Sequence, residues 1–157
     1  MKKYNDTITI GTISGIIAAI VMTLMDWILL LSGIQFTPPW VVAGNILLNT
    51  DVLYTPAGIL IGYIVQFLLG SGLGVIVTIV IRLTGKDYYL IKGLGVSSLF
   101  YIGNTGIMQT LVNIAPWMRS EISSTLMALI NFIVLGVLSS LIIAKYYEFN
   151  NKPNSQR

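Results

Sequence analysis

The sequence predicts an all-α, polytopic membrane protein, a bundle of four transmembrane helices with both termini in the cytoplasm (N-in/C-in). Three observations predict this class. First, 55% of the 157 residues are hydrophobic and only 10% are charged, against about 25% charged residues in a soluble domain. Second, the apolar residues fall into four blocks, each long enough for the helix of about 20 residues that crosses about 30 Å of hydrocarbon. Third, the cations gather at one set of block ends, as in cytoplasmic loops.

The four blocks leave no room for a soluble domain. Lys2 and Lys3 precede the first block, which is longer than the apolar region of a signal peptide and lacks a clear small-residue cleavage site. We therefore expect an uncleaved first span and a single transmembrane domain at residues 1–149. Its spans are expected at residues 8–32, 56–83, 89–114 and 121–146.

The longest predicted loop, residues 33–55, lies on the outer side. After Pro38 and Pro39, residues 40–48 are apolar but far too short to cross a membrane. They form either a short interfacial helix that begins after the prolines or an ordered apolar loop. The polar tail at residues 150–157 is expected to fray in the cytoplasm.

The orientation follows from the cations, because Lys and Arg near span ends are retained on the cytoplasmic side. Arg119 is the only cation on the predicted outer side. The inner side carries the other eight, which are Lys2, Lys3, Arg82, Lys86, Lys92, Lys145, Lys152 and Arg157. Aromatic rings favour the membrane surface, and those expected at the outer surface are Trp27, Trp40, Tyr54 and Trp117.

Every fourth residue of the second predicted span is small or polar. Small residues let helix backbones approach closely, which in lipid is a main source of helix association. Such a row drifts by about 40° per step around a straight helix, so we expect it to contact more than one neighbour. The helix-packing residues of this ridge are Gly58, Gly62, Gly70 and Gly74, with Gln66 between them.

Three amides are expected at similar depth in three different spans. Counting about 1.5 Å per residue from the outer surface places Gln66 and Asn131 about 14 Å deep and Asn104 about 10 Å deep. They are expected either to link the helices by hydrogen bonds, as polar residues commonly do in membranes, or to line a path for a substrate or ion.

Asp26 is the only acid expected inside a span, and an intramembrane carboxylate is by default a functional candidate with a partner to be named. Counting from Ile8 places it about 27 Å along the helix, near the outer edge of the hydrocarbon. Its natural partner is Arg119, with Gln109 near the same level. Three roles stay open: a link between spans, an acid that handles protons or cations, and an unpaired acid at the membrane surface.

No catalytic signature is present. The chain has no histidine and no cysteine, which removes the commonest general base and the commonest metal ligands. We expect no enzyme activity, no cofactor, no metal site and no nucleic-acid binding.

We expect an integral protein of the cytoplasmic membrane whose partners are the lipid bilayer and either further copies of itself or a membrane-protein partner. The protein is predicted to be a non-catalytic bundle that self-associates or packs with that partner. The alternative is a small oligomeric transporter or channel that uses Asp26 and the polar third span, with a substrate that the sequence does not name.

One stretch of the sequence resembles part of known proteins. Residues 62–101, GYIVQFLLGSGLGVIVTIVIRLTGKDYYLIKGLGVSSLFY, contain Gln66, the glycine ridge and the turn motif YYLIKG at residues 88–93. This stretch resembles part of the small, uncharacterised four-helix membrane proteins of spore-forming Gram-positive bacteria. The resemblance covers about a quarter of the chain and implies a bundle in the cytoplasmic membrane without an assigned activity.

Overall fold

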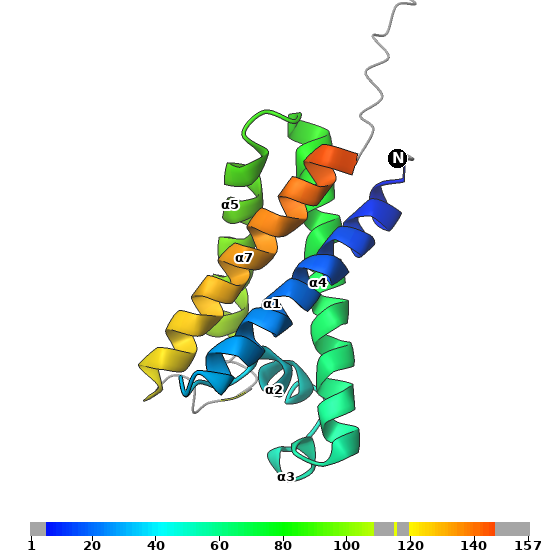
Figure 1. Ribbon diagram of the computed structural model, residues 1–157. Helices are drawn as coiled ribbons and strands as arrows, with labels where there is room; N and C mark the ends of the chain where they lie inside the picture. Colours follow the sequence, from blue (N-terminus) through cyan, green and yellow to red (C-terminus); the bar gives the residue numbers. More distant parts are fainter. Residues whose placement is uncertain (1–5, 109–114, 116–119, 147–157) are drawn as a thin grey trace, which may run out of the picture.

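The computed structural model describes residues 6–108, 115 and 120–146, and this part of the chain is helical without any strand. The prediction of an all-α protein is confirmed. Three helices are long and apolar enough to cross a membrane, namely α1 (Thr7–Leu31), α4 (Pro56–Thr84) and α7 (Ile122–Tyr146). In Figure 1, α1 lies obliquely across α4, α7 runs alongside α1, and α5 lies beside α7.

The segment predicted as the third span is shorter and irregular. Helix α5 (Tyr89–Ile102) has 14 residues, which is about 21 Å at 1.5 Å per residue and too short to cross 30 Å of hydrocarbon alone. It continues directly into a π-helical segment, η1 (Gly103–Met108). Residues 109–114, which complete the predicted span, lie outside the described residues.

The loop at residues 33–55 contains two short helices where the sequence predicted at most one. Helix α2 (Pro39–Gly44) begins with a proline in its first position, where the missing N–H leaves no hydrogen bond unmade. Helix α3 (Thr50–Leu53) follows after a turn. Helix α2 packs on α4, so the loop covers one end of the long helices (Figure 1).

The closest helix contact joins α1 to α4 through glycine. A Cβ built on Gly15 would collide with the carbonyl oxygen of Gly70, and one on Gly74 with that of Gly11. A Cβ on Gly70 would lie 2.9 Å from the Cβ of Ala19, closer than carbon atoms approach without strain. The backbones of α1 and α4 touch because these positions carry no side chain.

The glycine ridge of α4 contacts three elements in turn. Beyond the α1 contact, a Cβ on Gly62 would lie 2.6 Å from the backbone oxygen of Trp40 in α2, and one on Gly58 would lie 2.5 Å from that of Leu53 in α3. The ridge therefore winds around α4, as the drift of an every-fourth row requires. A second close contact joins α5 and α7, where Gly93 and Gly136 face each other.

Helix α1 begins at a side-chain cap. The carboxylate of Asp6 accepts hydrogen bonds from the backbone N–H groups of Ile8 (3.1 Å) and Thr9 (3.3 Å) and from the Thr9 hydroxyl. These are donors that a helix otherwise leaves unpaired. The bonds, led by the one from the Thr9 hydroxyl, hold the pKa of Asp6 below its ordinary value.

We expect Gly74→Leu to destabilise the fold by about 1–3 kcal/mol or more, because the side chain must enter a backbone contact. The matched control is Gly72→Leu on the same helix, where a Cβ meets nothing within 4 Å in the described structure. Unfolding in mixed micelles with increasing sodium dodecyl sulfate measures both. Equal stabilities for the two variants would contradict the α1–α4 contact.

Candidate functional site

Four polar side chains from three helices, three of them buried and one half-buried, form a group that we name the polar cluster. Its members are Thr23 and Asp26 of α1, Gln66 of α4 and Asn131 of α7. The α1–α4 glycine contact holds the first two helices together, and α7 packs along α1. The polar cluster therefore lies where the three long helices meet.

The centre of the polar cluster is the pair of Asp26 and Asn131. The side-chain amide of Asn131 donates to both carboxylate oxygens of Asp26, at 3.0 and 3.2 Å. Asp26 is 3% exposed and Asn131 is 2% exposed. A buried carboxylate needs hydrogen-bond donors because it has lost its water, and within the described residues the Asn131 side chain supplies them.

Gln66 binds α1 one turn away from the acid. Its amide nitrogen donates to the Thr23 hydroxyl oxygen at 2.9 Å, and that hydroxyl donates to the carbonyl oxygen of Ala19 at 2.8 Å. Gln66 is 5% exposed. The two amides thus attach α4 and α7 to the same face of α1.

Two acceptor atoms of the polar cluster have no hydrogen-bond partner in the described structure. They are the amide oxygens of Gln66 and Asn131, and both are buried. An unpaired buried acceptor is costly and often indicates a bound water or ion. A cavity of about 10 Å³ lies beside Asp26 and Gln66, which is room for about one water molecule.

Aromatic side chains line this cavity on the side of the loop at residues 33–55. The indole N–H of Trp27 donates to the Tyr63 hydroxyl at 3.0 Å, and Trp40 packs on Tyr63 with ring centroids 5.7 Å apart. Tyr54 contacts the other side of Trp40, edge to face, at 6.0 Å. Trp27, Trp40 and Tyr63 all line the cavity, so aromatic rings form its wall on this side.

The structure pairs the predicted polar residues differently from the expectation. Asn131 binds Asp26, and Gln66 binds Thr23, in place of a cluster of three amides. Asn104 is half-buried on η1 and takes no part in these bonds. Counting residues from the span ends separated Asp26 from Asn131 in depth, but α1 and α7 run side by side (Figure 1) and bring the two side chains within hydrogen-bond distance.

Two of the predicted site residues, Gln109 and Arg119, lie outside the described residues. The pairing of Asp26 with Arg119 therefore stays a prediction. The four ridge glycines are all buried and meet α1, α2 and α3 as described above.

Sequence reasoning missed two residues of this region. Thr23 precedes Asp26 by three residues and so shares its helix face, and Tyr63 stands in the same relation to Gln66. This spacing could have indicated both. Hydroxyl groups in a span are common, however, and nothing in the sequence distinguishes these two from the others.

The chemistry available in the polar cluster is hydrogen bonding by a carboxylate, two amides and a hydroxyl. Within the described residues, no three His, Cys, Asp or Glu side chains gather where they could hold a metal ion. Comparison of the chain with protein-family models, curated proteins and solved structures found no match. The site is therefore interpreted from its own geometry.

We expect Asn131→Leu to lower the free energy of unfolding by about 1–3 kcal/mol, because Asp26 loses these donors while staying buried. The loss should shrink in the Asp26→Leu background, where no carboxylate needs them. This double-mutant cycle should yield a coupling energy of about 0.6–1.7 kcal/mol. The control cycle combines Asp26→Leu with Asn104→Leu, and a coupling energy as large in that cycle would contradict the pairing.

Proposed function

We propose that the chain is an integral protein of the cytoplasmic membrane that crosses the bilayer four times, with both termini inside. Its outer surface supports this proposal. In the most apolar window of each long helix, only 33–44% of the residues are buried, so more than half of each window is at least partly exposed. An apolar surface of that extent requires lipid or a partner around it.

The fourth crossing is assigned to α5 and η1 together. They join 14 and 6 residues into a continuous helical segment of 20, close to 30 Å long at the α-helical rise. The turn before α5 is short, and Gly85, with φ at +86°, ends α4 in the conformation that favours glycine. This turn returns the chain toward the opposite end of the bundle.

The orientation follows from an asymmetry of charge. Every Lys and Arg of the described residues lies at the end formed by the start of α1, the α4–α5 turn and the finish of α7, which we name the basic end. Its cations are Arg82, Lys86, Lys92 and Lys145. The positive-inside rule places such an end in the cytoplasm.

We further propose that the protein is non-catalytic and acts by packing with a second copy or a membrane partner. The main support for this proposal is the tight packing of the polar cluster. Its amides bind Asp26 and Thr23 across helices, and the cavity beside them holds no more than about one water. Such a centre ties helices together and offers no space for an organic substrate.

The glycine ridge of α4 packs against other helices of the same chain, so association with a second copy or a partner requires another surface. Helix α5 and η1 present Gly95 and Gly103, where a Cβ would meet nothing within 4 Å among the described residues. They are eight residues apart, about 80° around an α-helix, so both fall on one broad side of this segment. Small residues on a lipid-facing helix let a second helix approach closely, which makes this face the proposed contact.

We expect Gly95→Leu combined with Gly103→Leu to weaken self-association by about tenfold, because a steric loss near 1.4 kcal/mol has that effect. Energy transfer between differently labelled copies in liposomes, measured at increasing lipid dilution, reports the equilibrium. Gly72→Leu on α4 is the control. Unchanged association in the double variant would remove this face from the proposal.

A second candidate function is a small oligomeric transporter or channel that uses Asp26 and the polar α5–η1 segment. The two unpartnered amide oxygens beside the acid favour it, because a carboxylate and amide oxygens are typical ligands of hard cations. Cation flux in the same liposomes, lost in Asp26→Asn, would support this function over the first. The resemblance of residues 62–101 to small four-helix membrane proteins of spore-forming Gram-positive bacteria supports the membrane class and does not separate the two functions.

A further inference from the structure

The cavity of about 10 Å³ in the polar cluster is lined by a buried carboxylate, a hydroxyl and a buried amide. Thr23 and Asp26 line it from α1, and Gln66 lines it from α4. The amide nitrogen of Gln66 is bonded to the Thr23 hydroxyl, and the amide oxygen of Gln66 has no hydrogen-bond partner. The cavity therefore combines one acid with a neutral oxygen that still needs a partner.

Asp26 receives hydrogen bonds but no positive charge from the polar cluster. The neutral amide of Asn131 donates to both carboxylate oxygens. A carboxylate offers about four acceptor sites, so both oxygens can bind a further ligand. A buried charge is costly unless it is also paired with an opposite charge.

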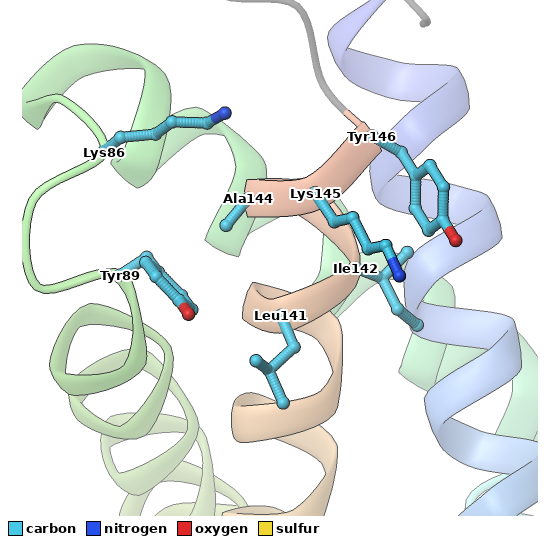
Figure 2. A pocket seen from close by; sticks show the side chains of 7 residues that line it. All are labelled: Lys86, Tyr89, Leu141, Ile142, Ala144, Lys145 and Tyr146. Carbon is cyan, nitrogen blue, oxygen red and sulfur yellow. The ribbon is translucent and has the colours of Figure 1, made fainter. Parts of the chain in front are cut away.

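The cations of the described residues all lie at the basic end, away from this cavity. Figure 2 shows two of them, Lys86 on the α4–α5 turn and Lys145 on the last turn of α7. A third, Arg82, donates to the Thr7 hydroxyl oxygen at 2.8 Å, and Asp26 lies about 28 Å farther along α1 than Thr7. An ionised Asp26 therefore needs a counter-charge from outside the described residues.

The charge and the size of the cavity favour a small monovalent cation. One carboxylate balances one positive charge, whereas a divalent ion would leave a net charge buried between apolar helices. Calcium takes about six to eight oxygen ligands and magnesium keeps several waters, but the cavity has room for about one water molecule. Sodium is smaller than potassium and suits this space better.

We propose that the polar cluster binds one sodium ion, with the Asp26 carboxylate and the Gln66 amide oxygen as its main ligands. The ion supplies the positive charge that Asn131 does not, and it satisfies the unpaired oxygen of Gln66. The Thr23 hydroxyl oxygen has a second lone pair available as a further ligand. Because the main ligands come from α1 and α4, the bound ion stabilises the contact between these helices.

This site differs from the sequence expectation of no metal site, which was based on the missing His and Cys side chains. Its ligands are one carboxylate and neutral oxygens, which are the groups that hard cations prefer. A resident ion of this kind requires neither self-association nor transport, so the inference goes beyond the proposed function. Either one can fail without the other.

Thermal unfolding of the purified full chain in a nonionic detergent tests the site, with sodium, potassium or N-methylglucamine chloride at one ionic strength. We expect sodium at about ten times its dissociation constant to raise the unfolding midpoint by about 3–6 °C over N-methylglucamine. Potassium should raise it by less than about half as much. Fluorescence titration with sodium measures the dissociation constant independently, because Trp27 and Trp40 line the cavity.

Variants of the two main ligands locate the ion. We expect Asp26→Asn to abolish the sodium shift, because it removes the charge while keeping the shape of the side chain. The matched control is Asp51→Asn, the same change at an exposed acid outside the cavity, which should keep the shift. Gln66→Met should weaken sodium binding by about tenfold, as expected for a loss near 1.4 kcal/mol. A purely structural role of Gln66 would instead lower the midpoint equally in all three salts.

Equal midpoints of the natural chain in the three salts would show that the polar cluster needs no cation and would overturn the site. That measurement stays decisive even if a variant does not fold. An equal response to potassium would overturn the choice of sodium. A sodium shift that persists in Asp26→Asn, or disappears in Asp51→Asn, would contradict the location.

Arg119 is the other candidate counter-charge of Asp26, and Arg119→Gln separates the two. A sodium shift that appears only in this variant would make Arg119 the partner of the acid and would overturn the inference. An equal sodium shift with and without Arg119 supports the bound ion.

Discussion

Direct contact between the backbones of α1 and α4 is the interaction on which the rest of the structure depends. Lipid is as apolar as the helix surfaces, so burial of apolar side chains gives membrane helices little reason to associate. Close packing and interhelical hydrogen bonds must supply the attraction. Gly11 and Gly15 of α1 meet Gly70 and Gly74 of α4 with no side chain between them, and this contact brings Thr23 within reach of Gln66.

The hydrogen bonds of the polar cluster fix how the packed helices are aligned along one another. A glycine contact can slide by a turn at modest cost, but a hydrogen bond between named side chains fixes the register of two helices. Gln66 fixes α4 on α1, and Asn131 fixes α7 on α1 through both oxygens of Asp26. Helix α1 is therefore the element that the other two long helices share. The acid lies between helices, where its donors are, because its burial would otherwise be too costly.

The sequence predicted the elements well and their pairings less well. Block length and hydropathy depend only on local composition, so α1, α4 and α7 lie within one residue of their predicted bounds. The winding of the glycine ridge followed from helix geometry. The hydrogen-bond partner of Asp26 did not follow from the sequence, because depth counting assumes that all helices stand upright, whereas α1 and α7 both lean relative to α4 (Figure 1). The sequence also contains no periodic pattern that predicts the π-helical segment η1 or the second short helix, α3.

In the proposed arrangement, the bilayer is the solvent of this chain, which crosses it four times with the basic end inside. Labelling with a membrane-impermeant thiol reagent tests it most directly, because the chain has no cysteine of its own. Leu47→Cys and Ser120→Cys lie at the end opposite the basic end, and Tyr88→Cys lies in the α4–α5 turn. All three positions are exposed. We expect positions 47 and 120 to react in intact cells and position 88 to react only after permeabilisation. Labelling of position 88 in intact cells, or of 47 and 120 only after permeabilisation, would contradict it.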